Sequence, residues 1–160
     1  MSSFKASDKV WVYTSAKEFT PSQKDFLLQR AEAFLKSWES HGDKVKGEIG
    51  IAYDHFVIVV ADDCGGNMCG RAQDAQVRFI KEIGEELGID LTDRMQLAYK
   101  ADNSSSKVLV KKMPDFKQEI QLGNITADTI VFNNMITTFG EFRDQWETQL
   151  KNSWHKQLMN

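Results

Sequence analysis

The stretch His55-Phe56-Val57-Ile58-Val59-Val60-Ala61 is the most apolar segment of the chain, and it is rich in β-branched residues. Such a segment is typical of a strand buried on both faces, so we expect it in the middle of a sheet. An acidic, glycine-rich segment follows it, Asp62-Asp63-Cys64-Gly65-Gly66-Asn67-Met68-Cys69-Gly70. An amphipathic helix is then predicted over residues 70–87. The rest of the fold is expected to form around this strand.

Three further elements are predicted before and beside this strand. Val10-Trp11-Val12-Tyr13-Thr14 is β-branched and aromatic, which favours a first strand. Thr20-Pro21-Ser22-Gln23 has the residues of a helix N-terminus, with Thr20 as N-cap and Gln23 placed to close a capping box. A short segment at 45–53 alternates weakly, so we expect it to form an antiparallel hairpin with the apolar strand.

The element order predicts the fold class. Residues 94–100 alternate apolar and polar side chains and favour a half-buried strand, which completes the order βαββαβ. This order is required for a ferredoxin-like two-layer sandwich, an antiparallel four-stranded sheet with both helices on one face. We therefore expect an α+β protein with a ferredoxin-like core over residues 1–100.

A smaller βαβα extension is expected after the polar loop 101–106. Its predicted elements are a strand at 107–111, a short helix at 114–122, a strand at 129–132 and a helix at 140–150. The last helix is predicted from Phe142, Trp146 and Leu150, because apolar residues four positions apart lie on one face of a helix. We treat residues 107–160 as an extension packed on the core, so that residues 1–160 form one domain.

Composition limits the partners and the location. The chain has 160 residues, 41% hydrophobic and 27% charged, with a net charge of -3, so it offers no basic field for nucleic acid. No apolar stretch approaches the roughly 20 residues that span a bilayer, and the N-terminus lacks the apolar core of a signal peptide. We expect a cytoplasmic protein whose two cysteines are free thiols. The three histidines show no ligand spacing, so no metal or cofactor is expected.

The glycine-rich loop is a candidate anion site. Gly65 and Gly70 have the separation of the two P-loop glycines, and Gly66 lies between them in the same loop. Exposed backbone N–H groups and the start of the following helix attract anions. However, Arg71 stands where the phosphate-binding lysine belongs, and Ala72 stands where a magnesium-binding hydroxyl belongs. The sequence therefore predicts no nucleotide hydrolysis here, and it leaves open anion binding or a plain strand-to-helix connection.

The two thiols give a second hypothesis. Cys69 is expected at a helix N-terminus close to Arg71, and both features lower a thiol pKa. Cys64 could then form a disulfide with an oxidised Cys69, because glycines between them let the loop fold back. The alternative is that both are half-buried thiols without chemistry.

A third group of residues lies near the C-terminus. Trp146, Trp154 and His155 could form a partner-binding patch, since aromatic residues are enriched at the centres of interfaces. Packing of these residues onto the sheet is the alternative.

Several stretches together resemble a small family of bacterial proteins of about the same length, whose members often carry the label ABC transporter ATPase. They are 10–13, 93–100, 128–134 and Ser153-Trp154-His155-Lys156. The family pattern Gly-Cys-Ser-Ile-Asp before the second helix is matched here at Gly70 and Asp74, so the resemblance adds Asp74 to the candidate ligand-binding residues. The label implies an ATPase, but without a P-loop lysine we expect no such activity.

Taken together, the sequence favours a non-catalytic ligand- or partner-binding domain. A protein partner is expected, or a homodimer formed through a sheet edge or an open sheet face. The alternatives are an anion- or nucleotide-binding protein that uses Gly65, Gly66, Gly70, Arg71 and Asp74, and a thiol-dependent enzyme or redox switch at Cys69. The sequence identifies neither the ligand nor the oligomeric state.

Overall fold

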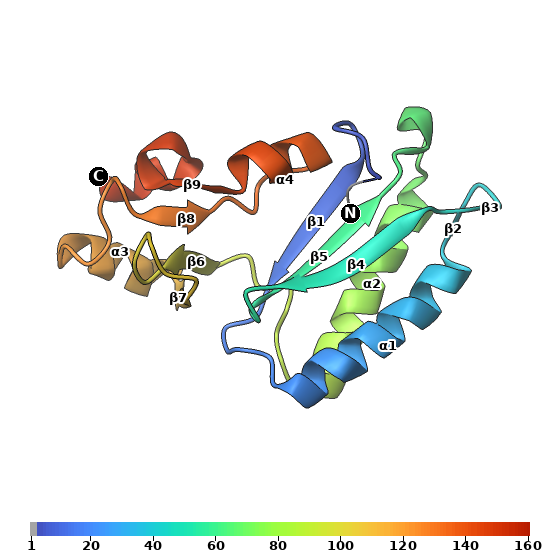
Figure 1. The fold of residues 1–160 in the computed structure, drawn as a ribbon, viewed down its shortest axis with the longest axis horizontal. Coiled ribbons are helices and arrows are strands. Elements are labelled where there is room, and N and C mark those ends of the chain that lie inside the picture. Colours follow the sequence, from blue (N-terminus) through green and yellow to red (C-terminus); the bar gives the residue numbers. More distant parts are fainter. Residues whose placement is uncertain (1–2) are drawn as a thin grey trace.

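The computed structural model describes residues 3–160 and has two regions (Figure 1). Residues 1 and 2, part of the N-terminus in which no signal peptide is expected, lie outside the described residues. The first region contains β1 (Lys9–Thr14), α1 (Pro21–Ser37), β2 (Glu39–Ser40), β3 (Asp43–Lys44), β4 (Gly47–Ala52), β5 (Phe56–Ala61) and α2 (Gly70–Leu87). The second contains β6 (Gln96–Lys100), β7 (Val108–Lys112), α3 (Met113–Gln121), β8 (Ile130–Phe132), α4 (Phe139–Gln145) and β9 (Glu147–Gln149). Three short 3-10 helices complete the chain: η1 (Cys64–Gly66), η2 (Leu150–Asn152) and η3 (Trp154–Met159).

The first region is an antiparallel sheet in the order β1-β5-β4 with α1 and α2 on one side. The predicted capping box is present, because Thr20 accepts from the Gln23 backbone and the Gln23 side chain accepts from the Thr20 backbone. The second helix begins at Gly70 and ends before Gly88, which has φ 69°. The central strand and the helix over residues 70–87 are therefore confirmed.

The strand β5 belongs to two hydrophobic cores at once, because successive side chains of a strand point to opposite faces. Val57, Val59 and Ala61 pack with the helices α1 and α2. Phe56, Ile58 and Val60 pack on the other face, with side chains from the second region. All six residues of β5 are buried. This arrangement explains why the segment is apolar throughout rather than alternating.

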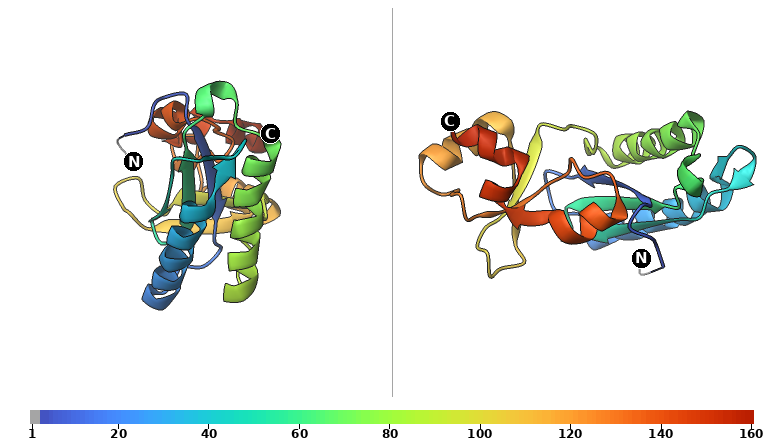
Figure 2. Two further views of the ribbon diagram at one scale, coloured as in Figure 1. Left: turned by 90° about the vertical axis from the view of Figure 1, so that its right-hand side faces the viewer. Right: turned by 90° about the horizontal axis from the view of Figure 1, so that it is seen from above.

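The second region is a smaller antiparallel sheet in the order β7-β6-β8-β9. β6 and β7 pair along five positions, whereas β6 and β8 share the single pair Tyr99↔Val131. Its outer face has a core of its own, built from Leu97, Tyr99, Phe116, Ile125, Val131 and Leu150. Seen from the side of α1 and α2, the second region lies behind the β1-β5-β4 sheet (Figure 2, left).

The two regions share one core and one polar cluster. The rings of Phe56 and Trp146 lie 4.9 Å apart between centroids, and those of Phe56 and Phe132 lie 4.8 Å apart. At its border, the Tyr53 hydroxyl donates to Glu147 Oε1 at 2.7 Å, and Lys100 lies 3.0 Å from the same oxygen. Both faces of the β1-β5-β4 sheet are thus covered, so the predicted open face that could form a homodimer is not present.

Two predictions about the fold need correction. The strand predicted at 94–100 was expected to complete a four-stranded sheet with the first three strands. It corresponds to β6, which pairs with β7 and β8 in the second sheet, so the first sheet has the three strands β1, β5 and β4. The helix predicted over 140–150 ends at Gln145 and is followed by β9. A continuous helix would place Trp146 and Leu150 on one face, whereas they pack in two different cores.

No helix within residues 3–160 is both long enough and apolar enough to cross a bilayer.

Candidate functional site

The outer edge of β1 lies where a fourth strand of the first sheet would pair. The first part of this edge is covered, because Val10 donates its backbone N–H to the Thr137 carbonyl at 3.0 Å. Phe139 likewise donates to the Asp8 carbonyl at 2.8 Å, around the single bridge Lys9↔Thr138. Farther along the strand, the Asn134 side chain donates its Nδ2 to Thr14 Oγ1 at 2.8 Å, so residues 134–139 follow this edge on both sides of Val12.

The next position along this edge is Val12. Ser15 donates its backbone N–H to the His55 carbonyl at 2.6 Å, so the odd-numbered residues of β1 form hydrogen bonds with β5. In an antiparallel pair every second residue turns its N–H and C=O away from its partner strand. Val12 is such a residue, and within residues 3–160 no other segment pairs with it. Its backbone groups therefore face the space beside the sheet.

A groove of about 600 Å³ lies in this space, within the range of ligand-binding pockets, roughly 300–1,000 Å³. It is bounded by β1, by one side of α2, by residues 91–97 and by residues 132–137. The aromatic side chains of Trp11, Tyr13 and Trp154 contribute to its lining, as do the exposed apolar side chains of Val77 and Met135. The fold thus leaves a ligand-sized groove beside β1.

Two polar atoms of the groove-lining residues are closed off from solvent and have no hydrogen-bond partner within residues 3–160. Gln96 is 6% exposed, and its Nε2 donates to the Asp90 carbonyl at 3.3 Å, which leaves Oε1 as an unpartnered buried acceptor. The Nε1 of Trp154 is a buried donor that also has no partner. Leaving a buried polar atom unpaired costs about 1–3 kcal/mol, and such atoms in a native protein require an explanation.

The charges around the groove are predominantly positive. Lys9, Lys81 and Arg94 line it, and none of them has an ion-pair partner in the described part of the chain. Asp93 also lines the groove, but it lies 3.4 Å from Lys112. The Met95 backbone N–H and the Lys112 ammonium hold the pKa of Asp93 below its ordinary value, so this carboxylate is already satisfied.

Tyr13 connects the groove to the core beneath it. Its hydroxyl donates to Gln76 Oε1 at 2.6 Å. Burial raises the pKa of Tyr13 to about 12, although the hydrogen bond with Gln76 and the charge of Arg94 act in the opposite direction. The phenol therefore stays neutral and acts as a donor at physiological pH.

The second candidate site is the N-terminus of α2, where Cys69 is the N-cap. The Ser40 hydroxyl accepts from the Cys69 backbone N–H at 3.0 Å and lies 3.5 Å from its Sγ as a donor. This hydrogen bond, followed by those with the backbones of Ala72 and His41, lowers the pKa of Cys69 to about 7. The sequence predicted this lowering from two causes, the helix N-terminus and Arg71. The first contributes through the backbone of Ala72 in the first turn of α2, whereas Arg71 is not among the groups that lower the pKa.

Ser40 and His41 could not be found from the sequence, because Ser40 lies 29 residues before Cys69 and reaches it through the β2–β3 hairpin. Cys64 behaves differently from Cys69. Burial, followed by the charges of Asp62 and Asp63, raises the pKa of Cys64. Both cysteines are free thiols in the structure.

The amides of the glycine-rich loop are engaged by its own carboxylates. Cys64 donates its backbone N–H to Asp62 Oδ1 at 2.7 Å, and Gly65 donates to Asp63 Oδ1 at 3.0 Å. These amides are among the donors that an anion would need. The other loop candidates are exposed on the surface: Gly66, Gly70, Arg71 and Asp74.

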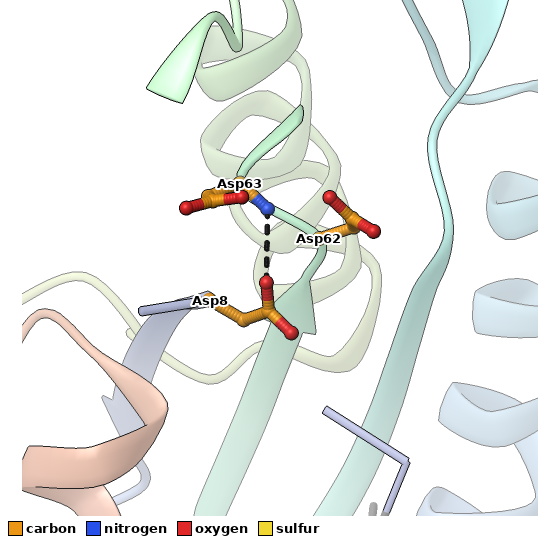
Figure 3. A group of neighbouring side chains, drawn as sticks. All are labelled: Asp8, Asp62 and Asp63. Atoms are coloured by element: carbon orange, nitrogen blue, oxygen red, sulfur yellow. Dashed lines mark hydrogen bonds between the residues drawn. The ribbon is translucent and has the colours of Figure 1, made fainter. Parts of the chain in front are cut away.

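Asp8, Asp62 and Asp63 form an acidic cluster where the start of β1 meets the end of β5 (Figure 3). One oxygen from each carboxylate lies within 4.8 Å of the others, a spacing at which they could hold a cation. Asp8 is 2% exposed and accepts the backbone N–H groups of Lys5 at 2.6 Å and Asp63 at 3.2 Å. These donors satisfy the buried carboxylate without an ion. The cluster joins residues 55 apart, which sequence spacing could not reveal.

The three C-terminal candidates lie in different environments. Trp146 is 5% exposed and donates its Nε1 to Asn134 Oδ1 at 2.9 Å. His155 is fully buried, accepts or donates a 2.7 Å hydrogen bond with Ser153 Oγ, and has a pKa lowered by burial to about 4. Only Trp154 reaches the groove, and its ring stacks on His155 with 4.1 Å between centroids.

The chain was compared with protein-family models, with curated proteins and with solved structures, and none of these matches it. The resemblance to bacterial proteins labelled ABC transporter ATPase therefore stays a prediction from the sequence.

Proposed function

We propose that this protein is a non-catalytic binding domain and that the groove beside β1 is its ligand site. The observation that carries the proposal is the groove itself, about 600 Å³ in volume, with aromatic walls from Trp11, Tyr13 and Trp154. Lys9, Lys81 and Arg94 also line it, and none of them has an ion-pair partner within residues 3–160. The groove also combines apolar walls with a few polar groups, which is typical of ligand sites.

The four tryptophans provide a test with an internal control. Trp11 and Trp154 line the groove, whereas Trp38 and Trp146 are buried and donate their indole N–H groups to Ala72 and Asn134. Indole N–H resonances of ¹⁵N-labelled protein, assigned by single Trp→Phe variants, would be followed against a set of heptapeptides and small anionic and neutral compounds. We expect ligands to shift the resonances of Trp11 and Trp154 and to leave those of Trp38 and Trp146 in place.

If no compound shifts the Trp11 or Trp154 resonance, the groove is not a ligand site. A set of ligands that shifts backbone resonances only around Arg71 would move the site to the glycine-rich loop. The sequence also predicts a thiol site at Cys69 and an anion site at Gly65, Gly66, Gly70, Arg71 and Asp74. Both remain predictions, and this experiment distinguishes them from binding in the groove.

We further propose that β1, α1, β4, β5 and α2 are a ferredoxin-like unit in which the position of the fourth strand is only partly occupied. The strand order β1-β5-β4 and the two helices on one face support this description. The shared core around Phe56 and Trp146 supports the proposal that both regions form one domain. The free thiols of Cys64 and Cys69 support a cytoplasmic location.

A further inference from the structure

We infer that the ligand of the groove beside β1 is a small aromatic anion, a planar ring system that carries a carboxylate or a phosphate group. This inference rests on the proposed function and names the class of ligand for the same site. Two features of the groove support it: its aromatic walls, which the protein holds in place, and its unpaired positive charges.

The aromatic walls of the groove are ordered by contacts within the protein. The Trp11 ring packs against the Trp38 ring with 6.3 Å between centroids, and the Tyr13 hydroxyl is held by its hydrogen bond to α2. The Trp154 ring stacks on His155 with 4.1 Å between centroids. The three rings that line the groove are partly exposed. Because they are already ordered, packing a planar aromatic ligand against them costs little conformational entropy.

The charged side chains of the groove favour an anion. Lys9, Lys81 and Arg94 come from β1, α2 and the turn before β6, and none has an ion-pair partner in the described part of the chain. Among the described lining residues the one carboxylate is Asp93, which is engaged by Lys112 at 3.4 Å. The groove is therefore positively charged on a chain whose net charge is -3, and this local excess favours a negatively charged ligand.

The apolar and the positively charged parts of the groove adjoin one another. Lys9 and Trp11 are two positions apart on β1, so their side chains leave the same face of the strand. Val77 and Lys81 are four positions apart on α2 and are both exposed, so they are neighbours on one face of the helix. One compact ligand can therefore contact apolar surface and a cation at the same time.

The borders of the groove favour a small molecule over an added strand. Asn134 Nδ2 donates to Thr14 Oγ1 at 2.8 Å, and the Val10 N–H donates to the Thr137 carbonyl at 3.0 Å. Residues 134–139 thus already follow the outer edge of β1. A volume of about 600 Å³ is that of a pocket for one small organic molecule. An inorganic anion would leave the aromatic walls uncovered, and a neutral ring would leave the cations unpaired.

The test uses naphthyl phosphate as the probe, together with two further aromatic anions, naphthoate and indole acetate. Three matched compounds accompany them: naphthol has the ring without the charge, cyclohexyl phosphate has the charge without the aromatic ring, and inorganic phosphate has the charge alone. Isothermal titration calorimetry on the full chain gives the affinity, and the indole N–H resonances give the place of binding. We expect the aromatic anions to shift the Trp11 and Trp154 resonances and to bind at least about tenfold more tightly than each matched compound.

Neutral variants of exposed side chains localise the binding. Arg94→Gln and Lys81→Gln are each expected to weaken binding of naphthyl phosphate about fivefold at low salt. Lys117→Gln is the matched control, because Lys117 is an exposed lysine on α3 that does not line the groove. It is expected to change binding by less than about twofold. Equal losses in all three variants would mean that the probe responds to net charge alone, and would overturn the role of the groove cations.

The outcomes separate this inference from the proposed function. If naphthol or one of the heptapeptides shifts the Trp11 and Trp154 resonances and the aromatic anions do not, the aromatic anion is overturned and the groove stays a ligand site. Equal affinity for naphthyl phosphate and cyclohexyl phosphate would overturn the role of the aromatic walls. Equal affinity for inorganic phosphate would show a site for a simple ion and overturn the inference. If no compound shifts either resonance, the proposed function fails as well.

Discussion

The two regions of this protein differ in the length of their helices and strands. The first has a sheet of three six-residue strands paired over their whole length, helices of 17 and 18 residues, and the short hairpin of β2 and β3. The second has strands of three to five residues, helices of nine and seven residues, and a β6–β8 junction with one residue pair. The second region has less regular structure of its own, so we expect its stability to depend on the aromatic core that it shares with β5.

The largest expected effect comes from removing the centre of that shared core. Trp146→Ala takes away a buried ring that packs against Phe56, Phe132 and Phe142, and it should lower the free energy of unfolding by about 3–5 kcal/mol. Urea unfolding would be followed by far-UV circular dichroism and by tryptophan fluorescence.

We expect coincident transitions by the two probes for the natural chain and for Trp146→Ala, because the regions share one core. Trp38→Ala, which alters only the core between the first sheet and its helices, is the matched comparison. Separate transitions for the two regions would show that they are independent domains and would overturn the proposed single domain.

Acid should destabilise the second region through His155. Its pKa is about 4 in the folded state because of burial, and about 6.5 when unfolded, so the unfolded chain binds an extra proton between these values. Above pH 6.5 the buried neutral His155 does not reduce the free energy of unfolding. As the pH falls from 6.5 toward 4, this free energy decreases by on the order of 3 kcal/mol.

The measurement is the difference in unfolding free energy between pH 7 and pH 4 for the natural chain and for His155→Gln. We expect this difference to be smaller in the variant. His41→Gln is the control, since the His41 side chain lies on the surface. An unchanged pH dependence in His155→Gln would contradict the assignment.

A smaller effect is expected at the polar border between the regions. Tyr53→Phe removes the hydroxyl that donates to Glu147, beside Lys100, and should cost about 1 kcal/mol in urea unfolding. Tyr99→Phe is the matched control, because the Tyr99 hydroxyl makes no hydrogen bond within the described residues. Equal losses in both variants would mean that the Tyr53 contact does not connect the two regions.

The smallest effect on stability is expected at the two thiols of the first region. Their specific effect is on the pH dependence of alkylation. Because the pKa of Cys69 is lowered to about 7, its alkylation by iodoacetamide should rise through neutral pH, whereas Cys64 should need a higher pH. Mass spectrometry would follow the two sites separately.

Ser40→Ala should shift the Cys69 profile to higher pH, because the hydroxyl that stabilises the thiolate is lost. Arg71→Gln should leave the profile in place. A profile that responds to Arg71→Gln and not to Ser40→Ala would restore the explanation drawn from the sequence.

Local signals made most of the first region predictable. The capping residues Thr20 and Gln23, the apolar strand that ends at Ala61 and the helix over residues 70–87 each have a short-range pattern, and each was confirmed. The partner of β6 could not be predicted, because an alternating strand fits any sheet that covers one of its faces. The spacing of Trp146 and Leu150 predicted one helix, and this was wrong because the two side chains pack in separate cores.

The candidate site was less predictable than the fold. Cys69 and the loop glycines follow one another in the sequence, so they could be named before the structure. The groove depends on Gln96, Trp154 and the edge of β1, which come from three distant segments. Neither the groove nor the unpaired amide oxygen of Gln96 has a sequence signature, since both depend on which distant segments the fold brings together.

The double role of β5 limits where the chain can accept an inserted residue. The hairpin before it turns through Tyr53 and Asp54, with φ 52° and 57°, and His55 donates to the Ala52 carbonyl at 3.1 Å. One extra residue that shifted the pairing by one position would turn Phe56 toward α1 and α2 and Val57 toward the second region, exchanging large and small side chains between two filled cores. An insertion scan should therefore give unfolded protein at 53–54 and folded protein in the exposed loop at 101–106.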